Sequence, residues 1–148
     1  MTDQKFETLK VWQKAHAFML DVHKQLVPLL PKEERFDLTD QIRRSSKSVA
    51  ANIAEGNGRF YYMDNVRFCY NARGSLDESM SHLKAALDLG YCPEEIYNKL
   101  RAEAEEIRRL LNGYITWLKT QKIGEKEPGA NLHVREISVE YLADSQSE

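Results

Sequence analysis

The sequence predicts an all-α protein, an antiparallel up-down four-helix bundle over residues 1–120. Apolar residues recur every three or four positions in four separate blocks, which is the spacing of one face of an α-helix. The alternation typical of a β-strand is absent before the C-terminal tail. Short segments containing proline or glycine connect the blocks, and short connections make neighbouring helices antiparallel.

Length and composition indicate one folded domain. The chain has 148 residues, of which 42% are hydrophobic and 30% charged. No apolar run approaches the roughly 18 residues that span a membrane, and the first residues lack the apolar stretch of a signal peptide. We therefore expect a cytoplasmic protein, in which Cys69 and Cys92 are reduced thiols.

The first helix is expected to end near Val27. Pro28 and Pro31 follow it, and proline lacks the amide hydrogen that a continuing helix needs. Its apolar stripe comprises Val11, Ala15, Met19, Val22 and Leu26, widened by Trp12 and Phe18.

The second helix is expected to begin at Thr39, a residue type that often caps helices, with Asp40 near the positive end of the helix dipole. Gly56-Asn57-Gly58 should end it as a C-terminal cap. The expected core stripe is Ile42, Ser46, Val49 and Ile53.

The third helix is expected from about Asp64 to Gly90, which suits the left-handed residue after a helix. Its stripe comprises Val66, Cys69, Leu76, Met80, Leu83 and Leu87. Gly74 lies inside this helix, where glycine costs about 1 kcal/mol relative to alanine. We therefore expect close contact with another helix at Gly74.

The fourth helix should begin with Pro93 at its first position, followed by acidic residues. Its stripe comprises Ile96, Leu100, Ile107, Leu111, Tyr114 and Leu118. Residues 121–148 form an acidic extension with six acids and three bases. The stretch 132–141 partly alternates, so it is open whether this extension adds a strand or arm to a neighbouring subunit or is a frayed tail.

Catalytic and metal-binding patterns are missing from the sequence. His16 and His23 are seven residues apart, whereas two ligands on one helix face are typically four apart. No glycine-rich phosphate loop and no nucleophile elbow is found. We expect no enzymatic activity, no cofactor and no metal site.

One segment of the chain is basic. Residues 42–75 contain six bases and two acids. Five of these bases are candidates for nucleic-acid binding: Arg43, Arg44, Lys47, Arg59 and Arg67. The adjacent Phe60-Tyr61-Tyr62 either stacks on unpaired bases or, more commonly for aromatic residues at a helix junction, covers the bundle end or a subunit contact.

The sixth base, Arg73, falls at the edge of the apolar face of its helix. A guanidinium at such a position should need a carboxylate partner, the alternative being contact with a ligand. We expect a structural ion pair with Asp77, four residues on, or with Glu55 across the bundle.

Five ordered motifs carry a resemblance to a known family. They are Leu9-Lys-Val-Trp-Gln-Lys-Ala-His16, Gln41-Ile-Arg-Arg44, Ala51-Asn-Ile-Ala-Glu-Gly-Asn-Gly-Arg59, Ala72-Arg-Gly-Ser-Leu-Asp-Glu78 and Leu87-Asp-Leu-Gly-Tyr91. Over roughly residues 6–120 the chain resembles the bacterial four-helix-bundle family of 23S rRNA intervening-sequence proteins. That family includes the accessory variability protein of diversity-generating retroelements.

The resemblance implies an up-down bundle that assembles into a ring-like homopentamer. For the accessory-protein branch it also implies binding of nucleic acid and of a reverse transcriptase. Two hypotheses therefore stand side by side. In the first, the oligomer binds RNA or another nucleic acid through a basic face repeated around the ring. In the second, it is a structural or protein-binding scaffold whose arginines form ion pairs between subunits.

Overall fold

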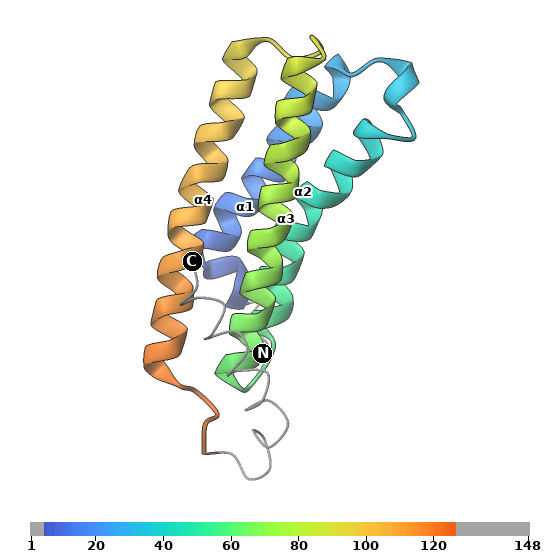
Figure 1. Ribbon diagram of the computed structural model, residues 1–148. Helices are drawn as coiled ribbons and strands as arrows, with labels where there is room; N and C mark the ends of the chain where they lie inside the picture. Colours follow the sequence, from blue (N-terminus) through green and yellow to red (C-terminus); the bar gives the residue numbers. More distant parts are fainter. Residues whose placement is uncertain (1–4, 127–148) are drawn as a thin grey trace.

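The computed structural model describes residues 5–126, and this part of the chain holds four α-helices and no strand. The helices are α1 (Lys10–Asp21), α2 (Leu38–Asn57), α3 (Tyr62–Asp88) and α4 (Glu94–Gln121). They run alternately up and down the long axis of the molecule (Figure 1). Helices α1 and α3 each pack on both α2 and α4. The predicted all-α four-helix fold is confirmed; the expected behaviour of the tail from residue 127 onward lies outside the described residues.

The predicted core stripes are mostly correct. In α2 the residues Ile42, Ser46, Val49 and Ile53 are all fully buried. In α1 the buried residues are Val11, Ala15 and Phe18, whereas Met19 is half-buried. The stripe of α3 is narrower than expected, because Ala72 and Ser79 occupy buried positions while Met80 and Leu87 lie at its margin. In α4 the core also takes up Tyr97, Ala104 and Ile115.

The connection between α1 and α2 differs in detail from the prediction. After α1 the chain makes a wider π-helical turn over Val22–Leu26 and a 3₁₀ turn over Val27–Leu29, so the helical path does end near Val27. Helix α2 begins at Leu38, and Thr39 is buried instead of capping the helix. The Leu38 amide instead lies 3.4 Å from the Glu34 carboxylate, which supplies an acceptor at the helix start.

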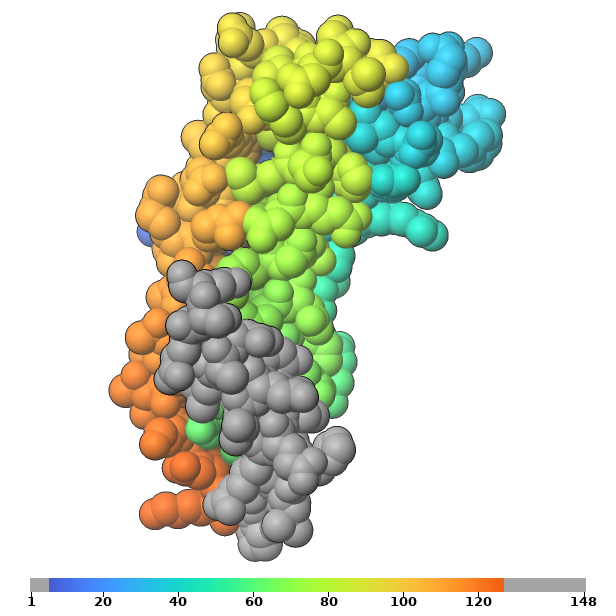
Figure 2. All heavy atoms as spheres, in the orientation of Figure 1, coloured from blue at the N-terminus to red at the C-terminus, as the bar shows by residue number. Residues whose placement is uncertain are grey.

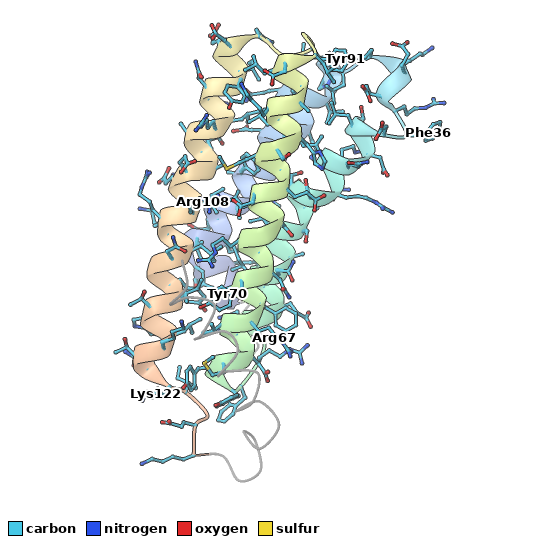
Figure 3. All side chains as sticks on the ribbon, in the orientation of Figure 1. Phe36, Arg67, Tyr70, Tyr91, Arg108 and Lys122 are labelled. Atoms are coloured by element: carbon cyan, nitrogen blue, oxygen red, sulfur yellow. The ribbon has the colours of Figure 1, made fainter. Side chains whose placement is uncertain are left out.

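A second contact of Glu34 joins the two connections at the upper end of the bundle. The Tyr91 hydroxyl donates a hydrogen bond of 3.0 Å to the Glu34 carboxylate, and Tyr91 lies at this end in Figure 3. Gly90 has φ +82°, and the amides of Gly90 and Tyr91 bond the carbonyls of Leu87 and Ala86. This is a Schellman cap, so the predicted role of Gly90 is confirmed. The neighbouring Pro93 is the residue before α4 and not its first helical residue.

Small polar residues line the contact between α2 and α3. The hydroxyls of Ser45 and Ser79 are 2.8 Å apart, and those of Ser48 and Ser75 are also 2.8 Å apart. Ser45 and Ser79 are buried, and besides the contact with each other their hydroxyls lie within hydrogen-bond distance of carbonyls of their own helices, those of Ile42 and Ser75. These pairs hold α2 and α3 close together along the middle of the bundle.

Glycine allows the closest approach of these two helices at Gly56, not at Gly74. A Cβ at Gly56 would lie 2.6 Å from the Asn65 side-chain oxygen and 2.9 Å from Cβ of Phe68. A Cβ at Gly74 would meet no atom within 4 Å, so the contact expected at Gly74 is absent within the described chain. Gly56 lies within α2, which ends at Asn57 with Gly58 as its C-cap, so the predicted end of the helix at Gly56-Asn57-Gly58 is confirmed.

Beyond α4 the chain folds back onto the start of α3. Lys122 and Gly124 have positive φ values of 52° and 83°, which turn the chain sharply. The Tyr62 amide then donates a hydrogen bond of 2.8 Å to the Ile123 carbonyl. This contact caps the first turn of α3 and brings the end of α4 beside the link between α2 and α3.

The two glycines provide a matched pair of substitutions. Gly56→Ala should lower the free energy of unfolding by about 1–3 kcal/mol, because the new methyl group overlaps Asn65 and Phe68. Gly74→Ala should raise it by about 0.5–1 kcal/mol, because alanine favours the helix and the methyl group meets open space. Urea denaturation of both variants measures the two effects. Equal destabilisation by both would contradict this assignment of the tight contact.

Candidate nucleic-acid interface

The first three candidate bases lie on the outer face of α2. Ile42, Ser46 and Val49 turn inward, so the opposite face of the helix, which carries the bases, points outward. Arg43, Arg44 and Lys47 are accordingly exposed, and side chains from the first half of α2 project at the right-hand edge of the molecule (Figure 2).

These three bases differ in their ionic partners. Arg44 lies 3.8 Å from Asp40, four residues earlier, and its side chain is 80% exposed. Arg43 and Lys47 have no carboxylate partner among the described residues. Their spacing of four residues places them one helical turn apart on the same face. Arg43 and Lys47 are thus a pair of adjacent cations available to an external anion.

The other two candidates, Arg59 and Arg67, both contact the ring of Phe68. The guanidinium carbons of Arg59 and Arg67 lie 4.9 Å and 5.4 Å from the centre of the Phe68 ring. Arg59 also pairs with Glu55 at 2.8 Å, and Arg67 approaches Asp64 at 3.8 Å. Arg67 extends from the lower half of α3 (Figure 3).

The structure therefore divides the five candidates into two groups. Lys47 is ten residues from Asn57, the last residue of α2, so at 1.5 Å per residue about 15 Å of helix separates the first group from the second. Three carboxylates accompany the five bases, namely Asp40, Glu55 and Asp64. Of the five bases, Arg43 and Lys47 are the two whose positive charges no nearby carboxylate of the described residues neutralises.

The ion pair expected for Arg73 is not formed. Its guanidinium donates a hydrogen bond of 3.0 Å to the Asn112 side chain and lies 4.9 Å from the Tyr70 ring centre. Asp77 instead binds Arg108 of α4, which points toward α3 in Figure 3. Glu55 binds Arg59. Arg73 thus joins α3 to α4 through an amide and an aromatic ring.

The aromatic segment after α2 has two roles. Tyr61 is 6% exposed and closes the lower end of the bundle, as expected for a helix junction. Phe60 is 63% exposed. Trp117 of α4 was not among the candidates predicted from the sequence. It is 48% exposed and stacks with Tyr114 at 6.0 Å between ring centres. The spacing of three residues between Tyr114 and Trp117 on one helix could have indicated this aromatic pair.

A charged cluster between α1 and α4 contains the carboxylate with a strongly altered pKa. The pKa of Glu103 is raised from 4.5 to about 7, chiefly by burial and then by a hydrogen bond to Asp21 and the negative charge of Asp21, while the charges of Lys99 and Lys14 lower it. Lys99 lies 3.4 Å from Asp21 and 3.8 Å from Glu103. Oε2 of Glu103 is buried without a hydrogen-bond partner. These groups link α1 to α4.

The part of the chain that the structure describes contains neither a metal-binding cluster nor a membrane-spanning helix. No group of three or more histidine, cysteine, aspartate or glutamate side chains is arranged to hold a metal ion there. No helix in the same residues combines the length and the apolar character needed to cross a membrane.

Comparison with known proteins gives a family match. Residues 7–113 match the model of the family described as 23S rRNA-intervening sequence protein. The resemblance carried by the five sequence motifs is thereby confirmed. The matched region contains α1, α2 and α3 and ends within α4. No curated protein matches this chain.

A solved structure supports the fold. The chain is similar to the crystal structure of a protein with unknown function from the S23 ribosomal protein family of Bacteroides thetaiotaomicron VPI-5482. The two chains are 25% identical with a TM-score of 0.66. The similarity covers 71% of this chain and 97% of the other.

The raised pKa of Glu103 predicts a pH-dependent stability. The folded protein binds this proton more tightly than the unfolded chain, so the free energy of unfolding should fall as pH rises from 4.5 to about 7. Glu103→Gln removes this titration and should stabilise the protein at pH 8 by on the order of 1 kcal/mol. Denaturation at pH 5 and pH 8 measures the effect, with Glu105→Gln as control. A Glu103→Gln protein with the wild-type pH dependence would refute the assignment.

Proposed function

Because this chain belongs to the family of 23S rRNA-intervening sequence proteins, we propose that it is a non-enzymatic oligomeric protein that binds RNA through the outer face of α2. The observation that carries this proposal is the adjacent pair Arg43 and Lys47, exposed and without a carboxylate partner among the described residues. Two such cations one helical turn apart suit contact with the phosphates of a nucleic-acid backbone.

The remaining candidates extend this basic face. Arg44, Arg59 and Arg67 are held by exposed or partly exposed ion pairs with nearby acids. Such pairs contribute little to stability, about 0–1 kcal/mol each, so a phosphate can replace the carboxylate at small cost. Arginine offers a planar set of donors that matches phosphate oxygens.

Self-association belongs to the same proposal. One chain presents only a few cations to an RNA. In a cyclic homo-oligomer this basic face is repeated, which would raise the affinity for one long RNA. By resemblance to the family, we expect the oligomer to be a homopentamer. The outer face of α2 offers a place for close approach at Ala51, an exposed residue with a small side chain.

A second candidate function is a protein-binding scaffold that does not touch nucleic acid, such as a partner of a reverse transcriptase. The observation that favours it lies at the upper end of the bundle, where large apolar side chains are exposed. Phe36 is 83% exposed, Leu89 57% and Leu29 43%. Phe36 projects from the connection between α1 and α2 (Figure 3). Exposed apolar groups of this kind are typical of protein contacts.

Charge reversal separates the two functions. The variant Arg43→Glu/Lys47→Glu should bind structured RNA at least tenfold more weakly than wild type at low salt. The slope of log affinity against log salt concentration should fall by about two units, because two phosphate contacts are lost. Fluorescence anisotropy measures binding, and light scattering measures the oligomer, which should keep its wild-type mass.

The control variant is Lys10→Glu/Arg109→Glu, which changes the net charge equally at exposed positions of α1 and α4. It should retain most of the affinity. Wild-type protein that binds no RNA, or a charge-reversed α2 that binds as well as the control, would reject the RNA-binding function. Loss of the oligomer in Arg43→Glu/Lys47→Glu would instead support arginines in contacts between subunits.

A further inference from the structure

At the lower end of the bundle, two hollows adjoin the second group of bases. The smaller has a volume of about 250 Å³, and its walls include Arg59, Phe60, Tyr62, Tyr114 and Trp117. The larger, of about 490 Å³, is lined by Phe60, Lys122 and Lys126 among others. Phe60 lines both hollows. Residues from the α2–α3 link, from α3 and from α4 thus meet at one place.

The smaller hollow has the chemistry of a site for a flat aromatic group. The rings of Tyr114 and Trp117 are nearly parallel, with 12° between their planes, and Trp117 and Phe60 are about half or more exposed. Pockets for drug-sized ligands usually measure about 300–1,000 Å³, so a hollow of 250 Å³ suits a single planar ring system. Aromatic side chains of this kind stack with nucleobases, whatever the base.

The polar groups around the hollow favour a nucleotide over a purely apolar ligand. Arg59 lies on the wall of the smaller hollow, and Lys122 and Lys126 lie on the wall of the larger. The Tyr114 hydroxyl accepts a hydrogen bond of 3.2 Å from the Asn65 amide, which fixes the hydroxyl at the pocket. The nearby acids are Glu55, which pairs with Arg59, and Glu125, which lines the larger hollow. Each hollow is therefore lined by at least one cation.

We propose that this pocket binds one unpaired base of a single-stranded RNA between Phe60 and Trp117, with the attached phosphate directed toward Arg59 and Lys122. This inference rests on the proposed RNA-binding function and adds a site for single strands. The α2 face contacts the backbone of any RNA, whereas the pocket requires a base that is free of a pairing partner.

The backbone geometry explains why the pocket is formed. Gly124 packs so closely on the link that a Cβ there would lie 2.9 Å from the Phe60 carbonyl oxygen. The Tyr62–Ile123 hydrogen bond holds the same segments together. Phe60 is therefore attached to a well-supported backbone while its ring stays exposed, which lowers the entropic cost of binding a base.

Tryptophan fluorescence of the full-length protein tests the proposal. Trp12→Phe leaves Trp117 as the single tryptophan, since the chain has two. We expect an oligoadenylate of five nucleotides to quench the fluorescence of Trp117. An abasic oligomer with the same number of phosphates should leave this fluorescence unchanged. Phe60→Ala and Trp117→Ala should weaken binding of labelled oligoadenylate by about tenfold, with less than a twofold effect on duplex RNA. The matched control is Phe36→Ala, an exposed aromatic residue at the other end, which should bind as wild type.

The possible outcomes separate this inference from the proposed function. Equal quenching by the abasic oligomer, or unchanged oligoadenylate affinity in Phe60→Ala and Trp117→Ala, would overturn the base pocket. Duplex binding that depends on Arg43 and Lys47 without any response of Trp117 would retain the proposed function and reject the pocket. Quenching by adenosine monophosphate in a protein that binds no duplex would support the pocket and reject the α2 face.

Discussion

The close approach of α2 and α3 is the constraint on which the rest of the structure depends. Gly56 leaves room for the Asn65 side chain, and the serine pairs above it keep the two helix axes near each other. The link between the two helices is therefore short, and the helix contact fixes its position. Its position determines where Arg59 and Phe60 stand, and with them the chemistry of the lower end. A wider separation at Gly56 would displace these functional candidates while leaving the helices intact.

Much of this fold follows from the sequence because helix formation and burial are read from local spacing. The stripe of α2 and the left-handed Gly90 were predicted correctly for this reason. Contacts between helices were predicted less well. The cost of a glycine inside a helix is a local property, but the neighbour that justifies it belongs to another helix, so the tight contact was assigned to Gly74 instead of Gly56. The partner of Arg73 was missed similarly, since Asn112 is 39 residues away.

The candidate site shows the same division. Exposure of Arg43, Arg44 and Lys47 follows from their places on the α2 wheel. The grouping of Arg59 with Arg67 around Phe68 depends on where α3 begins after the link. The aromatic pocket depends on more than fifty residues of intervening chain between Phe60 and Trp117. Local sequence patterns therefore predict which residues face solvent, and only the packed structure shows which of them share a site.

The buried thiol of α3 has a consequence for studying this protein. Cys69 is fully buried one helical turn from Asn65, and burial raises its pKa to about 12. The thiolate that reacts with alkylating agents is therefore almost absent while the helices are packed. Cys69 is therefore alkylated only when the bundle opens transiently, so its alkylation measures this opening. The rate of this alkylation, measured by mass spectrometry, would report how often the packing around Cys69 opens, with no change to the sequence.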